Sequence, residues 1–355
     1  MNRPPMHSVG EISRMLAART QDLVGELLPM GRREGAEWRC GSLAGERGQS
    51  LAVHLHGAKA GVWCDFASGQ RGDVLDLVAQ VRFGGDLVEA LRWSRMYLGL
   101  GHTGGGFRTV QAAAPLKRPD LERDDAGRRA SARAMWLDGV PIPGTPVAAY
   151  LAGRGIELAE LGRVPGALRF LPECWCGEVK LKLPAMVAAI TRRGVHVATH
   201  RTWLMCERGT WRKARLQAAK KVLGGFAGGV IALHRGQSGK PLAQAPENDT
   251  VALCEGVEDA LTLALHMPEW RALAVVSLGN MGAVQLPPQL ADVMLVFDRD
   301  GENPQARQAR ERAVKHFMEE GRSVREQRPP EGFKDMNEWH QAWRAEAAAR
   351  REGVA

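Results

Sequence analysis

Apolar runs and amphipathic stretches alternate along the last third of the chain. The apolar runs are short and contain β-branched residues, as buried strands do, whereas the stretches between them have the length and pattern of helices. Strand and helix in turn predict a parallel sheet with right-handed crossovers. The predicted strands are 251–256, 273–279, 293–301 and 323–329, and the predicted helices include 257–267 and 304–321.

Earlier in the chain the pattern predicts further units. Apolar positions recur at helical spacing over residues 9–28, and short strands and turns then run into a helix that ends near residue 81. A Gly, Ala and Pro-rich stretch that becomes charged predicts a linker, and strands are again predicted within 185–205. The predicted domains are 1–100, a linker at 101–134, a subdomain at 135–245, an α/β domain at 246–343 and a tail at 344–355.

Length and composition exclude several classes of protein. The chain of 355 residues has room for two or three domains, and its hydrophobic content of 45% is ordinary for a globular protein. No apolar run reaches the roughly 20 residues of a membrane helix, and the N-terminus lacks the apolar core of a signal peptide. Six scattered cysteines do not make a disulfide framework. We therefore expect a cytoplasmic protein without membrane contact.

Positive charge is concentrated in one segment. The net charge is +8, but residues 192–240 alone contain eleven Lys and Arg residues against one acid, Glu207. Such a one-sided block more often meets phosphate than solvent alone. It predicts a nucleic-acid partner.

Carboxylates follow two of the predicted strands directly. Glu255 ends the strand at 251–254, and Asp298 and Asp300 end the apolar run at 293–297. Because sites in open α/β sheets gather at the carboxyl ends of strands, these three acids would share one rim if the strands are neighbours. Crowded carboxylates repel each other, and Mg²⁺ is the usual partner that relieves this repulsion.

The sequence around these acids resembles that of a known family. “CEGVEDALT”, “VSLGNMGAVQLP” and “VFDRDGENPQA” are similar to the toprim domain of bacterial-type primases, topoisomerases and some nucleases, whose hallmark is a Glu after one strand and D-x-D after a later one. “FKDMNEW” resembles a later primase segment whose acids help to bind metal, with Asp335 as the match, while Asn337 and Glu338 depart from its pattern. Upstream, “LPAMVAAITRRGVHVATHRTWL” and “KARLQAAKKVLGGFAGGVIALH” resemble the basic half of plasmid- and phage-borne toprim primases.

This resemblance implies a fold and an activity. The fold would be α/β, with a Rossmann-like parallel sheet in the toprim domain, preceded by a basic mixed α/β primase subdomain and a small zinc-ribbon-like N-terminal domain. The activity would be that of a DNA primase, a nucleotidyltransferase that makes short primers on single-stranded DNA in plasmid or phage replication. Glu255, Asp298 and Asp300 would be catalytic and, together with Asp335, would hold Mg²⁺ or Mn²⁺.

The resemblance also implies the binding partners. Besides the single-stranded template and NTPs, a replicative helicase acting in trans is implied. The residues that would bind nucleotide phosphates or template are Arg201, Lys213, Lys220 and Lys221.

The N-terminal unit resembles the primase zinc ribbon, but two of the four ligands are missing. Where the family places a second ligand three residues after each first cysteine, Cys40 is followed by Leu43 and Cys64 by Ala67. We therefore expect no zinc. One alternative stays open, a zinc site that uses another set of four ligands: Cys40, His54, His56 and Cys64.

Three rival functions follow from the same residues. A toprim nuclease would use the same acids and metals to cleave phosphodiesters, and a non-catalytic adaptor would use only the basic segment. A topoisomerase needs a tyrosine nucleophile, but Tyr97 and Tyr150 lie in apolar, helix-like text where core packing is expected. “HRGQSGKPL” imitates a phosphate loop, although it has Pro241 where Ser or Thr belongs.

Overall fold

The computed structural model describes residues 7–43, 45–65, 70–100, 119–247, 249–299 and 304–352. The chain divides into two units, Met1–Leu116 and Lys117–Ala355. Each unit has its own hydrophobic core.

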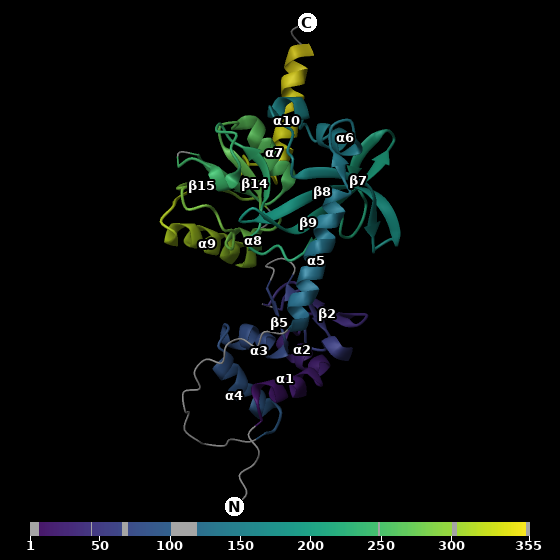
Figure 1. Ribbon diagram of the computed structural model, residues 1–355, viewed down its shortest axis with the longest axis vertical. Coiled ribbons are helices and arrows are strands. Elements are labelled where there is room, and N and C mark those ends of the chain that lie inside the picture. Colours follow the sequence, from purple (N-terminus) through teal and green to yellow (C-terminus); the bar gives the residue numbers. More distant parts are fainter. Residues whose placement is uncertain are drawn as a thin grey trace, which may run out of the picture. The chain divides into compact units, whose positions relative to one another are not determined.

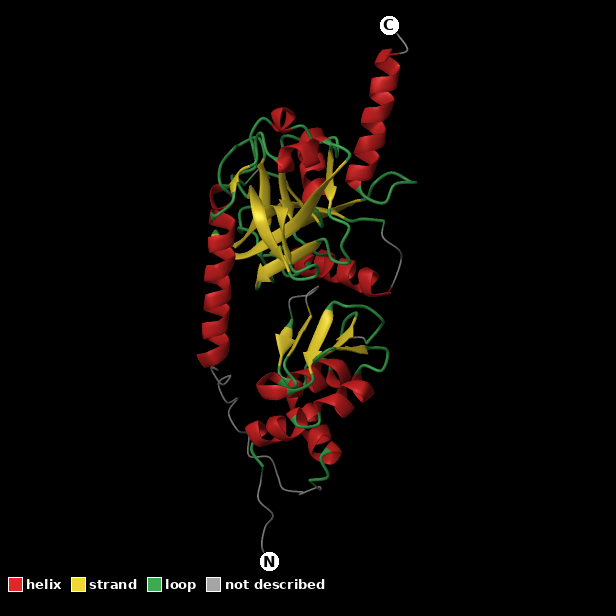
Figure 2. Ribbon diagram, turned by 90° about the vertical axis from the view of Figure 1, so that its right-hand side faces the viewer, coloured by secondary structure: helices red, strands yellow, loops and turns green. Residues whose placement is uncertain are grey.

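The N-terminal unit is a five-stranded antiparallel meander with helices on one side (Figures 1 and 2). Its strands follow one another in the order β1 to β5. They are β1 (Arg32–Glu34), β2 (Glu37–Cys40), β3 (Leu51–His54), β4 (Trp63–Asp65) and β5 (Arg71–Gly72). The helices are α1 (Val9–Ala17), α2 (Thr20–Leu27), α3 (Val74–Phe83) and α4 (Leu87–Tyr97), with a 3₁₀ turn at Gly57–Lys59.

The single helix predicted at 9–28 is divided in two. α1 begins with a capping box between Ser8 and Glu11 and ends at Ala17, and α2 begins at Thr20. The Thr20 hydroxyl donates to the Ala17 carbonyl at 2.8 Å and so satisfies one of the carbonyls that the end of α1 leaves free. The break lets both helices bury their apolar stripes in the same core, which periodicity alone does not reveal.

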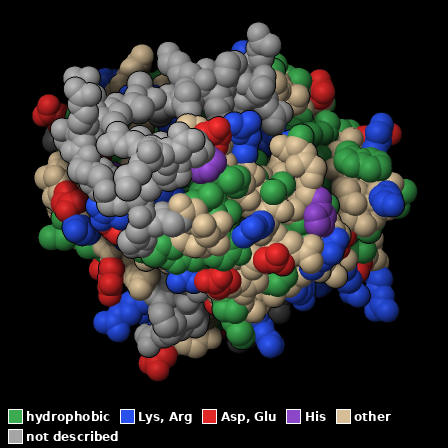
Figure 3. Space-filling view, turned by 90° about the horizontal axis from the view of Figure 1, so that it is seen from below, with side chains coloured by type: hydrophobic (Ala, Val, Ile, Leu, Met, Phe, Trp, Pro, Cys, Tyr) green, Lys and Arg blue, Asp and Glu red, His purple; other side chains and the backbone are tan. Residues whose placement is uncertain are grey.

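On the face of the molecule that Figure 3 shows, acidic and basic side chains are mixed with apolar ones.

The second unit begins with a mixed region that corresponds to the predicted basic subdomain. Helix α5 (Pro119–Leu137) leads into a sheet in the order β10-β9-β8-β7-β6, and β11 also pairs with β9. Residues 119–134 are therefore helical where the sequence predicted a linker. The strands are β6 (Val140–Pro141), β7 (Leu168–Cys176), β8 (Leu181–Arg192), β9 (Val195–Glu207), β10 (Thr210–Lys213) and β11 (Lys220–Gly224). Helix α6 (Pro146–Ala152) and a 3₁₀ turn at Leu158–Leu161 complete this region.

A second sheet, of five strands in the order β12-β14-β13-β15-β16, forms the rest of the unit. Its last four strands are parallel, as predicted, but the edge strand β12 is antiparallel to β14. Because β12 precedes residue 245, this sheet begins before the predicted boundary. The strands are β12 (Ile231–Arg235), β13 (Val251–Cys254), β14 (Arg271–Ala274), β15 (Asp292–Val296) and β16 (Ser323–Gln327). The helices are α7 (Val257–His266), α8 (Leu278–Met281), α9 (Pro304–Glu319) and α10 (Met336–Glu352), with a 3₁₀ turn at Leu242–Gln244.

One core joins the two sheets of this unit. Residues from β8 and β9, from the buried helix α7 and from β13 and β14 pack in a single cluster, so α7 lies between the sheets (Figure 1). Smaller clusters cover the far face of each sheet. This packing brings the basic strands and the carboxyl ends of the parallel strands into one structural unit.

Candidate active site

Two of the predicted carboxylates lie at adjacent strand ends. β13 and β15 pair in parallel, with Cys254 opposite Val296, so Glu255 and Asp298 follow neighbouring strands at the same edge. The Glu255 carbonyl accepts a hydrogen bond from the Val276 N–H at 3.1 Å. Val276 has a φ of +76°, which is strained for a β-branched residue and is a feature of functional sites. Asp300 lies outside the described residues.

A third acid, Asp259, was not predicted from the sequence. It lies in the first turn of α7, is buried, and accepts a hydrogen bond from the Asn337 N–H at 3.1 Å. Burial and then the charge of Asp335 raise the pKa of Asp259 to about 6. Asp335 itself accepts from the Glu338 N–H at 2.7 Å at the start of α10. The spacing of Asp259 from Glu255, one helical turn, was the available signal.

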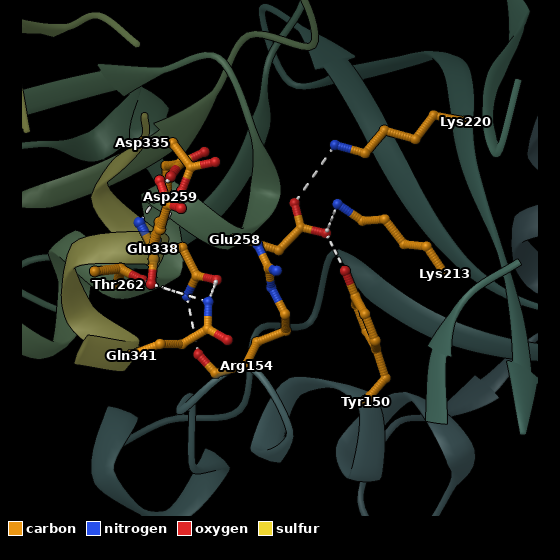
Figure 4. A network of polar contacts seen from close by, with 11 residues as sticks. Tyr150, Arg154, Lys213, Lys220, Glu258, Asp259, Thr262, Asp335, Glu338 and Gln341 are labelled. Carbon is orange, nitrogen blue, oxygen red and sulfur yellow. Dashed lines mark hydrogen bonds and ion pairs between the residues drawn. The ribbon is translucent and has the colours of Figure 1, made fainter. Parts of the chain in front are cut away.

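Asn337, which departs from the family pattern, has a structural contact of its own. It is fully buried, and its amide donates to the Arg154 carbonyl at 3.0 Å and to the Thr262 hydroxyl at 2.9 Å (Figure 4). These bonds hold the start of α10 on α7 and on the segment after α6. Asn337 thus fixes the start of the helix that follows Asp335.

A second acid of α7, Glu258, joins the parallel sheet to the basic strands. Its carboxylate lies 3.0 Å from the Lys213 Nζ and 3.6 Å from the Lys220 Nζ, and the Tyr150 hydroxyl donates to it at 2.5 Å (Figure 4). Burial alone would raise the pKa of Glu258, but Lys220 and Lys213 lower it far below its usual range. Glu258 therefore holds two lysines on the side of the sheet that faces α7.

Arg154 lies beside Glu258 in the same view (Figure 4). Its Nε is buried and has no hydrogen-bond partner among the residues that the structure describes. A guanidinium nitrogen in this state is a candidate for contact with an anionic ligand. The sequence offered no signal for Arg154, which is one of three arginines within residues 154–169.

The four predicted basic residues lie on two faces of their sheet. Lys221 is opposite Arg201 on β9 and Lys220 is opposite Thr202, so neighbouring lysines point in opposite directions. Lys213 and Lys220 face α7 and Glu258. Arg201 lies on the other face, 5.1 Å from the centre of the Trp203 ring, and burial lowers its pKa. The set does not form one surface.

The alternative four-ligand zinc site is not assembled in the N-terminal unit. In the register of β2, β3 and β4, Cys40 faces the core, whereas His54 and Cys64 face the other side of the sheet. Burial raises the pKa of the Cys40 thiol to about 12, and its Sγ–H donates to the Ser42 carbonyl. Leu43 packs on the same core, and Ala67 lies outside the described residues.

Among the described residues, which do not include Asp300, no three His, Cys, Asp or Glu side chains are grouped as a metal site. None of the described helices is long and apolar enough to cross a membrane.

Comparisons with known families match both parts of the second unit. Residues 250–346 match the Toprim domain family, and residues 126–233 match a domain of unknown function, DUF7146. Residues 250–346 form a toprim domain. The predicted α/β fold with a toprim sheet is confirmed, and its four predicted strands are the four parallel ones. The predicted primase-type basic region corresponds to the DUF7146 match, whose family description names no activity.

Solved structures similar to the chain include two primase fragments. One is described as the DnaG primase catalytic domain bound to single-stranded DNA, with a TM-score of 0.37, 16% identity and coverage of 67% of this chain and 83% of that chain. The other is the E. coli primase catalytic core, with a TM-score of 0.34, 16% identity and coverage of 62% and 76%. TM-scores and sequence identities this low support no conclusion about function. A comparison with curated proteins gave no significant match.

Proposed function

We propose that this toprim protein is a primase, a nucleotidyltransferase that joins NTPs on a single-stranded DNA template. One observation carries the proposal: the acidic edge of the toprim sheet adjoins a basic sheet in the same core, with Glu258 in contact with both Lys213 and Lys220. A polymerising site needs acids for metal and cations for triphosphate, and this unit supplies both side by side.

The acids at this edge suit a divalent cation. Glu255, Asp259, Asp298 and Asp335 offer carboxylate oxygens, which Mg²⁺ and Mn²⁺ prefer. Burial and then the charge of Asp335 raise the pKa of Asp259, and a bound cation would offset the second of these effects. Asp300 belongs to the same proposal through the D-x-D motif. A bound cation would supply charge neutralisation for the attacking 3′-hydroxyl and for the departing pyrophosphate.

The chain's own residues would do the rest. Lys213 and Lys220, whose Nζ atoms are held by Glu258, would bind the triphosphate beside the acids. Arg154, whose Nε has no hydrogen-bond partner among the described residues, would bind the same anion. Arg201 and Lys221, on the other face of the sheet, would contact template rather than nucleotide.

The proposal extends to partners and setting. The resemblance implies a replicative helicase acting in trans during plasmid or phage replication. None of the six cysteines, all of which the structure describes, is in a disulfide bond, which supports a reducing compartment such as the cytoplasm.

A matched pair of variants tests the proposal. Asp298→Asn removes a carboxylate from the carboxyl end of β15, whereas Asp292→Asn makes the same change at the other end of that strand. With NTPs, Mg²⁺ or Mn²⁺ and a panel of single-stranded templates, we expect wild type and Asp292→Asn to make oligonucleotides and Asp298→Asn to make none. Absence of product from wild type on every template would overturn the proposal. Cleavage of labelled DNA without NTPs would favour the nuclease.

A further inference from the structure

Two adjoining cavities lie on the second unit away from the acidic edge. One, of about 1020 Å³, is bounded by β12, by the loops at 163–167 and 191–194, and by the turns before β13 and β15. The other, of about 650 Å³, lies between α5 and the β8–β9 hairpin. Both are lined by Trp136, Ala189, Thr191 and Gly194, so they form one continuous groove.

This groove lies at the opposite end of the toprim sheet from Glu255 and Asp298. It reaches Arg271, the first residue of β14, and His316 near the carboxyl end of α9. In a parallel sheet with crossover helices, the starts of strands and the ends of helices share one edge, and the catalytic acids share the other. The groove is therefore separate from the candidate active site.

Its charge is almost entirely positive. Among the lining residues there is one acid, Glu320, which is already paired with Arg322 at 2.7 Å. Arg271 is likewise paired with Asp249 at 2.6 Å. Five lining arginines have no acidic partner among the residues that the structure describes: Arg129, Arg133, Arg163, Arg193 and Arg235. We call this surface the arginine groove.

The remaining lining is mostly apolar and includes an aromatic ring where the two cavities meet. Trp136 is half-buried, with the Arg169 guanidinium 4.0 Å from its ring centre, and Pro165, Leu242 and Leu286 line the larger cavity. Apolar and aromatic surface interleaved with cations suits bases and phosphates together. The five arginines are spread over four separate segments, which fits an extended polyanion better than one compact nucleotide.

We propose that the arginine groove binds single-stranded nucleic acid at a site remote from the catalytic acids. That the bound strand is the template rests on the proposed function. Binding itself requires no catalysis at the acidic edge. Arg235, whose pKa is lowered by burial and by Arg163 and Arg271, experiences the like-charge repulsion that a bound phosphate would relieve.

Binding of a labelled single-stranded oligonucleotide, followed by anisotropy in EDTA, tests the groove without catalysis. The full chain is compared with Arg163→Ala/Arg193→Ala and with a control, Arg325→Ala/Arg350→Ala, which loses the same charge from exposed positions outside both cavities. We expect the groove variant to bind about tenfold more weakly and to lose about 1.4 from the slope of log K against log salt, from about 0.7 per phosphate contact. The control and Arg163→Lys/Arg193→Lys should keep the wild-type slope.

Three outcomes would overturn the inference. Equal losses in the groove variant and the control would reduce the effect to net charge. Unchanged oligonucleotide binding with lost binding of free ATP would make the groove a nucleotide site, and a preference for duplex over single strands would exclude the proposed ligand. Asp298→Asn should bind the oligonucleotide as wild type does. If the protein binds the oligonucleotide in the groove but makes no primers, the proposed function is contradicted and this inference is still supported.

Discussion

At the scale of single residues, Glu258 is a buried acid that three side chains contact. Its two carboxylate oxygens are shared by Lys213, Lys220 and Tyr150. Breaking a buried ion pair by removing one partner leaves the other charges without compensation, which costs more than losing a neutral hydrogen bond. The lysines are partly exposed, so water offsets part of this cost.

We therefore expect Glu258→Gln to lower the free energy of unfolding by about 2–4 kcal/mol. Tyr150→Phe, which removes one hydrogen bond to the same carboxylate, should cost about 1 kcal/mol. Urea denaturation of both variants and the wild type measures the difference. If Glu258→Gln costs no more than Tyr150→Phe, the lysines are not held by this carboxylate.

His200 makes stability depend on pH. Burial and then the charge of Lys220 lower its pKa to about 3, and its Nδ1 has no hydrogen-bond partner within the described residues. The unfolded chain takes up a proton near pH 6.5, about the pKa of free histidine, while the native state stays neutral, so stability falls as the pH drops below that value.

This residue alone should reduce the free energy of unfolding by about 2 kcal/mol between pH 7 and pH 5. In His200→Gln that part of the pH dependence should be absent, because glutamine does not titrate. Denaturant titrations of wild type and variant at the two pH values give the two slopes. Parallel slopes would mean that His200 is protonated in the native state.

At the scale of elements, β11 separates two lysines that the sequence presents as a pair. Lys220 faces the acidic edge through Glu258, whereas Lys221 faces the side of Arg201. On the proposed function, Lys220→Ala should raise the KM for NTPs about tenfold through the loss of a charge-assisted contact. Lys221→Ala should change that KM by less than about twofold. Primer synthesis at varied NTP concentration distinguishes them, and equal KM changes would contradict this assignment.

The secondary-structure elements also show which features of the fold and the site could be predicted from the sequence. The alternation of apolar runs and helices predicted the parallel strands and placed the acids at their carboxyl ends, because both follow from the local pattern. That β13 and β15 are neighbours is known only from the structure. Glu258 and Asp259 could not be assigned in the same way. Which side of α7 meets acids and which meets lysines depends on the basic sheet packed against it, and that contact joins residues about 40 positions apart.

The same limit explains the other differences. In the sequence the edge strand β12 belongs to the basic segment, because it lies within residues 192–240, and only its pairing with β14 assigns it to the toprim sheet. The break between α1 and α2 interrupts a continuous helical pattern at a point set by the shape of the core. The candidate ligands Cys40 and His54 were separated by strand register, which composition does not contain.

At the scale of the whole molecule, the chain has two units with separate cores. Each hydrophobic cluster among the described residues draws its buried members from one unit only. Leu51 in the first unit and Leu253 in the second are both fully buried on sheet strands, and so form a matched pair. Since a cooperative transition requires a shared core, we expect two unfolding transitions rather than one.

Leu51→Ala should therefore destabilise only the transition of the first unit, and Leu253→Ala only that of the second. Each substitution removes the same buried atoms and leaves a cavity, for which the expected cost is about 2–5 kcal/mol. Calorimetry of the full-length wild type and both variants assigns each transition by the variant that shifts it. Mg²⁺ should raise the transition assigned by Leu253→Ala, because a ligand stabilises the unit that binds it. A single transition lowered equally by both substitutions would show that the two cores unfold as one.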